Sequence, residues 1–510
     1  MKRLDWLALD LYFVLMLAVG IAIRNRVKNA RDFFTAGGSM PWWLAGISHH
    51  MSGYSAAVFV GYAALAYTEG FSIYIWWACS IATALLLGAN VFAVRWVRLR
   101  VYNDMISPLE YLSIRYGPKT KLCLACSGSA LKIFDVGAKL GASALLLQIF
   151  ANVHLLWGVL LIGGVTLVYS VAGGLWADAA TDLSQFLIQL VSGICMCIAV
   201  LSHLGGIQAV AGIWRQLPPS HRMPFHGQYT ASFAIAFLFI NLLSYNGGTW
   251  SLAQRFMAAP DPASARRSAL LSAALYLVWP LVLFYPMWAA PLLLPNLPNP
   301  ADSYALLAKQ LLPAGLIGLV LAGLVAHSMA MTSSDANAVS AVIVRDILPA
   351  IFPADGLSDE RKLLRAGRIS TLLFLAAGII IALLADRMGG ILGLILLWYG
   401  ALVGPGAVPM LLGMLPAFAR CGAPSALAAW LAGIISFALL RWFAPASIEA
   451  HSGSLVLSVA GPALISFLAY VFTGLVWPIN NPQAQRLLAQ MQQPDMLPHQ
   501  SLIPQEFTQP

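Results

Sequence analysis

An apolar segment of the chain, residues 33–70, is interrupted in its middle by small and polar side chains. These are Ser48, His49, His50, Ser52, Gly53, Tyr54 and Ser55. A continuous helix in a bilayer satisfies its own backbone hydrogen bonds, whereas open backbone is tolerated only where it lines a protected cavity. Carbonyls freed at such a break can coordinate a cation, and half-helix N-termini attract anions. The pattern therefore indicates a transport site in the middle of a membrane.

Charged side chains also lie inside a second apolar segment, over residues 122–150. They are Lys132, Asp135 and Lys139. Charges at this depth are costly and usually face a partner or a cavity. Asp135 and Lys139 are four residues apart, so they share a helix face and can pair. Two interpretations remain open: the pair only neutralises itself, or one lysine binds a carboxylate of a solute.

The composition is that of a polytopic membrane protein. Of the 510 residues, 60% are hydrophobic and only 10% are charged, and the mean hydropathy is +0.78. Soluble domains carry about 25% charged residues, so no separate soluble domain is expected. The net charge of +9 is gathered in particular loops, which favours membrane lipid and a small solute as partners, and neither nucleic acid nor a required partner protein. We expect a monomer.

The elements that must position these residues are membrane helices of about 20 residues each. This length predicts about thirteen of them, over 4–23, 41–66, 71–94, 122–150, 154–173, 176–202, 229–253, 269–292, 313–344, 369–386, 390–416, 424–444 and 454–478. We expect a leading helix and loop over 1–40, a ten-helix core over 41–416, two trailing helices over 417–478 and a tail over 479–510.

Lysine and arginine gather in alternate loops, beginning with the loop after the first helix. Because the positive side faces the cytoplasm, we expect the N-terminus outside and the C-terminus inside a bacterial inner membrane. The last residues are rich in Gln and Pro, which predicts a mobile tail.

A second break is predicted over residues 245–248, where Tyr, Asn and two Gly residues interrupt an apolar run. The two breaks open corresponding blocks of about five helices, which favours an inverted-repeat transporter. The alternative is that the glycines only permit close helix packing.

Several motifs resemble the sodium:solute symporter family. They are Phe33-Phe34-Thr35-Ala36-Gly37 with Pro41-Trp42-Trp43, Gly173-Gly174-Leu175-Trp176 with Thr181-Asp182, Gln254-Arg255, and Ser333-Ser334 with Asn337, Ser340 and Arg345-Asp346. The match runs in order over residues 5–420. The resemblance implies an all-α membrane protein of LeuT-type fold, a five-plus-five inverted repeat with discontinuous helices, and sodium-driven uptake by alternating access.

The resemblance also implies a cation site. Sodium prefers oxygen ligands, and the family uses carbonyls of the broken helix, here those of Met51 and Tyr54, with oxygens of its eighth core helix. Two registers stay open. In one, Ala330 is followed by the hydroxyl pair Ser333-Ser334. In the other, that pair falls on Ala330 and Met331, and Ser333 and Ser334 match a second sodium site completed by Asp182.

Simpler interpretations exist for both groups of ligands. The two serines could bond back to a helix carbonyl one turn earlier. Asp182 could serve only as a charge near a helix start.

The solute site departs from the sugar-transporting branch of the family. The positions that hold sugar hydroxyls there match Val58, Trp77, Thr249 and Tyr276 here, so that set of polar side chains is absent. The predicted solute-binding residues are Ser52, Gly53, Trp76, Trp77, Lys139, Tyr245, Asn246 and Trp250.

The resulting prediction is a sodium-coupled symporter that imports a small polar organic solute, such as a sugar, an organic acid or an amino acid. Na⁺ is the expected coupling ion. The alternatives are a proton-coupled or ion-independent transporter and, less favoured, a membrane solute sensor. An enzyme is not expected, because the sequence lacks a metal-ligand motif and a Ser/His/Asp set in a recognisable context.

Overall fold

The computed structural model describes residues 1–56, 58–352, 359–388, 399–443 and 452–493. Across these residues the chain is helical and forms no strand beyond an isolated bridge between His226 and Tyr229. Nine of the helices described are long and apolar enough to cross a membrane. The predicted all-α membrane fold is confirmed, whereas the number of about thirteen helices and the inverted repeat stay predictions. The first part of the helix predicted over 390–416 lies outside the described residues.

The first half of the chain runs from α1 to α10. The helices are α1 (Arg3–Ile23), α2 (Ala30–Thr35), α3 (Trp42–Met51), α4 (Ala63–Glu69), α5 (Ser80–Gly88), α6 (Val94–Asn103), α7 (Tyr111–Tyr116), α8 (Pro118–Ala151), α9 (Leu155–His203) and α10 (Ala209–Gln216).

The second half continues from α11 to α22. The helices are α11 (Ala231–Leu243), α12 (Ser251–Ala258), α13 (Pro262–Leu293), α14 (Ser303–Leu311), α15 (Leu316–Val342), α16 (Leu348–Ile351), α17 (Glu360–Leu383), α19 (Val408–Leu412), α20 (Ala423–Phe443), α21 (Ser452–Val476) and α22 (Pro482–Gln490).

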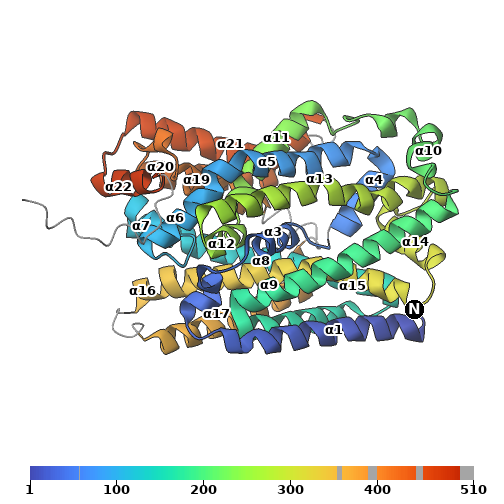
Figure 1. Ribbon diagram of the computed structural model, residues 1–510. Helices are drawn as coiled ribbons and strands as arrows, with labels where there is room; N and C mark the ends of the chain where they lie inside the picture. The colour runs from blue at the N-terminus through green and yellow to red at the C-terminus, as the bar shows by residue number, and fades with distance from the viewer. Residues whose placement is uncertain (57, 353–358, 389–398, 444–451, 494–510) are drawn as a thin grey trace, which may run out of the picture.

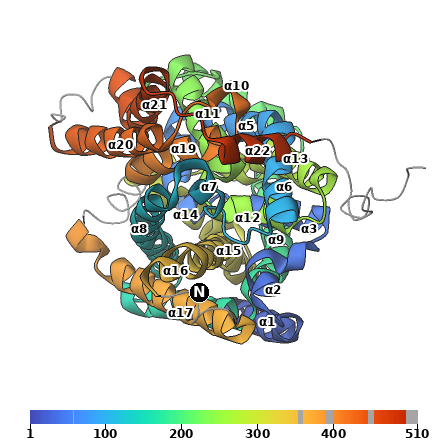
Figure 2. The ribbon, with the colours of Figure 1, turned by 90° about the vertical axis from the view of Figure 1, so that its left-hand side faces the viewer.

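The long helices run side by side, with α1 and α17 along one flank and α20 and α21 along the opposite flank (Figure 1). A view along the bundle places α12 and α15 in its interior (Figure 2). In its most apolar stretch α15 is 78% buried, whereas α1 is only 28% buried there. An apolar helix with an exposed outer face is expected where the surroundings are lipid rather than water.

Both predicted breaks are confirmed. Helix α3 ends at Met51. A π-helical turn follows over Val58–Tyr62, and α-helix resumes only with α4. The second break is a π-helical turn over Ser244–Gly248, in which Gly247 has a φ of 114°. These backbone segments give up regular α-helical hydrogen bonding in the middle of the bundle, which is the property that a transport site requires.

The helices predicted over 154–173 and 176–202 correspond to the two segments of α9, which meet at a kink. Gly174 produces the bend, with φ 51° and ψ −141°. A Cβ at this position would lie 2.4 Å from the carbonyl oxygen of Phe33. Only glycine fits this backbone without strain, and the bend sets the direction of the segment that carries Asp178 and Asp182.

The prediction of a mobile tail is wrong for α22. Asn481 caps this helix, its side chain accepting from the backbone N–H groups of Gln483 and Ala484. Leu487 and Leu488 are buried, and Arg98 Nη1 donates to the carbonyl of Met491 at 2.8 Å. A short apolar face among the glutamines is enough to dock the segment, which composition alone does not reveal. Residues 494–510 lie outside the described part.

Candidate functional site

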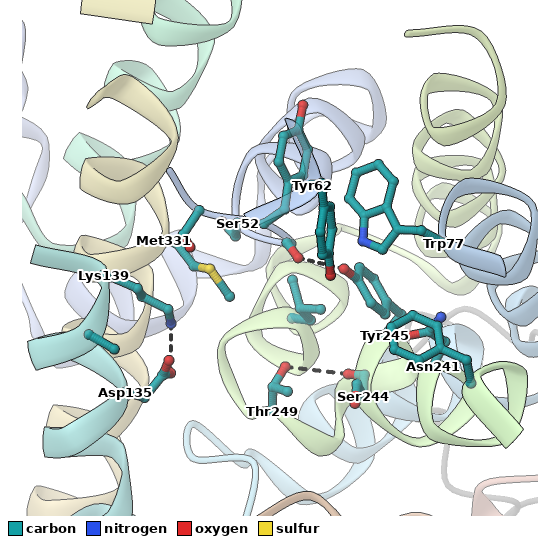
Figure 3. A pocket seen from close by; sticks show the side chains of 16 residues that line it. Ser52, Tyr62, Trp77, Asp135, Lys139, Asn241, Ser244, Tyr245, Thr249 and Met331 are labelled. Atoms are coloured by element: carbon teal, nitrogen blue, oxygen red, sulfur yellow. Dashed lines mark hydrogen bonds and ion pairs between the residues drawn. The ribbon is translucent and has the colours of Figure 1, made fainter. Parts of the chain in front are cut away.

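A cavity of about 140 Å³ lies between the two broken segments. The lining residues come from both breaks, from a π-helical turn over Tyr74–Cys79 and from α8, α11, α12 and α15: Ser52, Gly53, Tyr54, Ser55, Tyr62, Trp77, Asp135, Ala138, Lys139, Phe237, Asn241, Ser244, Tyr245, Thr249, Leu252 and Met331. In Figure 3 Lys139 and Asp135 lie on one side beside Met331, and Trp77, Tyr245 and Asn241 lie on the other. The cavity therefore has one charged wall and one aromatic wall.

The structure brings part of the predicted solute site together. The predicted residues that line the cavity are Ser52, Gly53, Trp77, Lys139 and Tyr245.

The other three predicted residues lie behind the walls. Trp76 stacks on Tyr229, with ring centroids 5.3 Å apart. The side-chain amide of Asn246 donates to the carbonyl of Ala84 at 3.0 Å. Trp250 is buried at the N-cap of α12 with a φ of 67°. Asn246 and Trp250 belong to the second break and the start of α12, and none of the three residues lines the cavity.

Two polar residues of α11 and its break line the cavity, although the sequence analysis missed them. Asn241 donates from Nδ2 to the hydroxyl of Ser80 at 2.5 Å, and its Oδ1 has no hydrogen-bond partner among the described residues. The Ser244 hydroxyl is likewise buried without a partner in the described chain. Buried polar groups normally find partners, so this pair is suited to hold a polar solute. A polar residue one turn before a break was the available signal.

A hydrogen bond across the cavity joins the two broken segments. The Tyr245 hydroxyl donates to the carbonyl of Gly53 at 2.5 Å. The ring of Tyr245 thus stands at the cavity wall while its polar end holds the opposite broken segment. This contact links the two halves of the site directly.

The charged wall belongs to a set of four buried charges that we call the four-charge cluster: Lys132, Asp135 and Lys139 of α8 and Asp335 of α15. Lys132 lies 2.6 Å from Asp335, and Lys139 lies 2.6 Å from Asp135 and also contacts Asp335. The predicted pair of Asp135 and Lys139 therefore forms, but with a second lysine and a second carboxylate. The formal charges of the four side chains cancel.

A second set of buried charges lies where α3, α9, α12 and α15 meet. It comprises Asp178 and Asp182 of α9 and Arg255 of α12, with the hydroxyls of Ser48, Ser52, Ser333 and Ser334 around them. We call it the anionic cluster. The two carboxylates are one helical turn apart, so they share a face of α9. The bend at Gly174 lies one turn before them.

Arg255 contacts most of the other members of the anionic cluster. Its Nη2 contacts both Asp178 and the Ser334 hydroxyl, and its Nε donates to Ser48 at 3.0 Å. Asp182 lies farther from this guanidinium, at 3.6 Å. Asp178 is therefore the closer ionic partner of Arg255.

Asp182 has an incomplete set of partners. The Ser48 hydroxyl donates to its Oδ2 at 2.5 Å, and its Oδ1 is buried without a hydrogen-bond partner among the described residues. An unsatisfied carboxylate oxygen surrounded by hydroxyls is the kind of ligand that a hard monovalent cation prefers. The residues present thus fit Na⁺ as a transported substrate. The interpretation of Asp182 as a charge at a helix start does not fit, since it lies two turns beyond the bend within α9.

A sequence model of the sodium:solute symporter family matches residues 33–433. The chain belongs to the sodium:solute symporter family.

Individual relatives agree with this assignment. The chain is 26% identical over 515 residues to the sodium/glucose cotransporter of Vibrio parahaemolyticus, covering 94% of this chain and 91% of that protein. It is 26% identical to the sodium/sialic acid symporter of Aliivibrio fischeri, covering 74% and 75%. For the sodium/myo-inositol cotransporter 2 of Oryctolagus cuniculus the identity is also 26%, but the match spans only 60% of that protein.

The fold has a close counterpart among solved structures. A substrate-bound, outward-open Na⁺-coupled sialic acid symporter superposes with a TM-score of 0.80 at 21% identity, covering 94% of this chain and 99% of that one. The predicted family and LeuT-type fold are confirmed. Sodium-coupled symport across a membrane is the function of this chain, and its family and relatives are transporters rather than enzymes.

The predicted cation ligands of this symporter fall into two groups. Ser333 and Ser334 both contact Asp178, and their hydroxyls also lie 3.0 and 2.7 Å from the carbonyl of Ala330. They therefore have access to back-bonding and to the anionic cluster at once. Ala330 takes part through its carbonyl, next to the two serines.

Met51 and Tyr54 lie at the end of α3, beside the anionic cluster. The Met51 side chain packs with Phe186 and Ala330. The Tyr54 ring lies 3.9 Å from that of His327, and its hydroxyl accepts from Gln189 at 3.0 Å. Their side chains support the break, and their role as carbonyl ligands stays a prediction.

Sequence analysis missed three charged residues of the two clusters. Asp335 directly follows the serine pair, Arg255 ends a family motif, and Asp178 lies one helical turn before Asp182. The available signal was the presence of charges in segments that must be buried, because each such charge requires a partner.

Proposed function

We propose that this symporter imports one small polar organic solute through the cavity while a cation binds at the anionic cluster. Ser52 is the observation that carries the proposal. It lines the cavity, and its hydroxyl lies 2.7 Å from that of Ser334 within the anionic cluster. Cation and solute thus share a residue of the broken segment, so either one affects the free energy of binding of the other.

The cavity walls suggest the chemistry of the solute. Trp77 and Tyr245 offer rings against which a sugar ring or another flat face can pack, and Asn241 and Ser244 offer hydrogen bonds. Lys139 and Asp135 add charge at the other end. Solutes with hydroxyl or carboxylate groups fit best, in keeping with the glucose, myo-inositol and sialic acid named for its relatives. A cavity of about 140 Å³ is below the ~300–1,000 Å³ typical of ligand sites, which favours a small solute.

The driving force is the sodium gradient together with the membrane potential, which contributes about 2.3 kcal/mol per charge for each 100 mV. We propose that the chain acts as a monomer in a bacterial inner membrane. The N-terminus lies outside and the tail lies in the cytoplasm, as the distribution of Lys and Arg favours. Residues 41–416 form the transport core.

A thermal-shift panel of sugars, amino acids and carboxylates, each with sodium or with choline, tests this proposal. A ligand that binds only the native state at 100 times its Kd stabilises that state by about 2.7 kcal/mol. We expect one solute class to raise the melting temperature strongly only with sodium. The best solute is then tested for uptake into proteoliposomes, and uptake that is unaffected by removal of sodium contradicts the proposal.

Proton coupling is the second candidate, since Ala330 and Met331 stand where one register places the usual hydroxyl pair. Asp182, buried with one oxygen unpartnered among the described residues, could carry a proton instead of binding sodium. In that case a pH gradient alone drives uptake, and Asp182→Asn removes the dependence on pH.

A further inference from the structure

The anionic cluster contains one more carboxylate than it has basic side chains. Asp178 and Asp182 face a single guanidinium, that of Arg255, and all three side chains are at most 1% exposed. In the motif that resembles the family, the recognised carboxylate is Asp182. Asp178 therefore needs an explanation of its own.

The two carboxylates differ in their contacts. Asp178 contacts Arg255 and the hydroxyls of Ser333 and Ser334. Asp182 lies 3.6 Å from Arg255 and has an oxygen with no partner among the described residues. Arg255 thus pairs mainly with Asp178, and the negative charge of Asp182 is not fully compensated.

The other titratable groups around the cluster do not supply the missing charge. The Tyr169 hydroxyl of α9 donates to the carbonyl of Met329 at 3.1 Å, and the Tyr12 hydroxyl of α1 lies 3.2 Å from the sulfur of Met329. His49 of α3 has one ring nitrogen 3.1 Å from the carbonyl of Tyr245 and the other 2.9 Å from the Ser272 hydroxyl, so both nitrogens bond away from the two carboxylates. The formal charges of Asp178, Asp182 and Arg255 sum to −1.

We infer that Asp178 is the fixed counter-charge of Arg255, and that it leaves Asp182 to bind a single monovalent cation in each transport cycle. A buried, unbalanced carboxylate is strongly unfavourable, and one bound positive charge removes that cost. Without Asp178, the guanidinium would neutralise Asp182 and the cation would lose its charged ligand. The inference rests on the proposed cation site and adds a residue and a stoichiometry to it. Either a sodium ion or a proton carries the single positive charge that this requires.

The decisive variant is Asp178→Asn, which makes the cluster neutral while keeping its size. The measurement is the Na⁺ concentration that half-maximally stabilises the protein in a thermal shift, and the same concentration for uptake. We expect it to rise at least about tenfold. Asp178→Glu retains the charge and should stay close to the wild type.

The double variant Asp178→Asn/Arg255→Gln restores a net charge of −1. We expect it to recover sodium binding relative to Asp178→Asn, although the side chains differ more from the wild type. This recovery separates a role in charge balance from a role in folding, because a folding defect would grow with the second substitution. A wild-type sodium affinity in Asp178→Asn, or a double variant that binds sodium no better than the single one, would overturn the inference.

The stoichiometry is measured as the ratio of ²²Na⁺ to labelled solute taken up by proteoliposomes. We expect a ratio of about one and a Hill coefficient for sodium of about one, since the coefficient cannot exceed the number of sites. A ratio of about two would contradict the single-cation inference while leaving sodium coupling intact. A parallel series with an imposed pH gradient and no sodium identifies a proton as the cation. Wild-type uptake that responds to neither ion removes the proposed function together with this inference.

Discussion

Two buried charge clusters lie on neighbouring residues of α15, and they differ in how their charges balance. The four-charge cluster joins Asp335 to α8 and contains two lysines and two carboxylates. The anionic cluster joins Ser333 and Ser334 to α9 and contains two carboxylates and one guanidinium. The formal charges of the first cluster cancel, whereas those of the second sum to −1, the charge that we propose a bound cation balances.

The geometry of a helix explains how one segment serves both clusters. Consecutive residues of an α-helix point about 100° apart, so Ser334 faces α9 and α12 while Asp335 faces α8. The comparison shows that buried charge alone does not identify a transport site. The informative quantity is the charge that remains after the protein's own ion pairs have been counted.

Asp335→Asn tests the four-charge cluster and carries the largest expected effect on stability. It leaves two buried lysines with one carboxylate, and breaking a buried pair from one side costs about 3–5 kcal/mol. We expect a clearly lower melting temperature in detergent, with and without sodium. If the variant melts like the wild type, the cluster is not a structural ion-pair network.

The control is the double variant Lys132→Met/Asp335→Asn. It removes one charge of each sign and leaves Lys139 with Asp135 at 2.6 Å. Because neutral side chains often replace a complete buried pair at little cost, we expect most of the lost stability to return.

Asp182→Asn makes the opposite change at the anionic cluster. It removes the carboxylate that lies farther from Arg255, at 3.6 Å, so we expect unchanged or higher stability without sodium. The stabilisation by sodium should fall at least about tenfold in apparent affinity, or about 1.4 kcal/mol. Differential scanning fluorimetry over a sodium series measures both quantities. The matched substitution Asp10→Asn, at an exposed position of α1, should change neither.

The sequence predicts the breaks in the backbone better than it predicts the ion pairs of the two clusters. The breaks near Gly53 and Gly247 were predicted, because a polar or glycine-rich interruption of an apolar run has a direct local meaning. The partner of Lys139 on α15 was not, since Asp335 lies 196 residues away. Such a pairing depends on which helix faces meet, and that is a property of the packed bundle.

The same limit applies to the cation site. The hydroxyls of Ser333 and Ser334 and the carboxylate of Asp182 were predicted from a motif. Which of the two carboxylates, Asp178 or Asp182, pairs more closely with Arg255 depends on how near each lies to the guanidinium in the packed structure. A pattern of residue types does not contain that information.

Gly174→Ala tests whether the bend of α9 aims the carboxylates of the anionic cluster. The backbone conformation is strained for alanine, and the new Cβ would lie 2.4 Å from the Phe33 carbonyl oxygen. A residue forced into such a conformation costs about 1–3 kcal/mol. We expect lower stability and weaker sodium stabilisation together, measured in the same thermal-shift series.

The matched control is Gly164→Ala in the same helix, where a Cβ would meet no atom within 4 Å. It should leave both quantities unchanged. If Gly174→Ala lowers stability but keeps the sodium affinity of the wild type, the bend does not position Asp178 and Asp182.

Tyr245→Phe has the smallest expected effect and acts on the cavity between the two clusters. It removes the hydrogen bond to the Gly53 carbonyl, which contributes about 0.5–1.5 kcal/mol, and it keeps the ring at the cavity wall. We expect the affinity for the solute to fall several-fold, while the melting temperature without solute changes little. Tyr67→Phe removes a hydrogen bond of the same kind, to the Leu294 carbonyl at 2.7 Å, away from the cavity. Equal effects of the two substitutions on solute affinity would show that Tyr245 has no special role in the solute site.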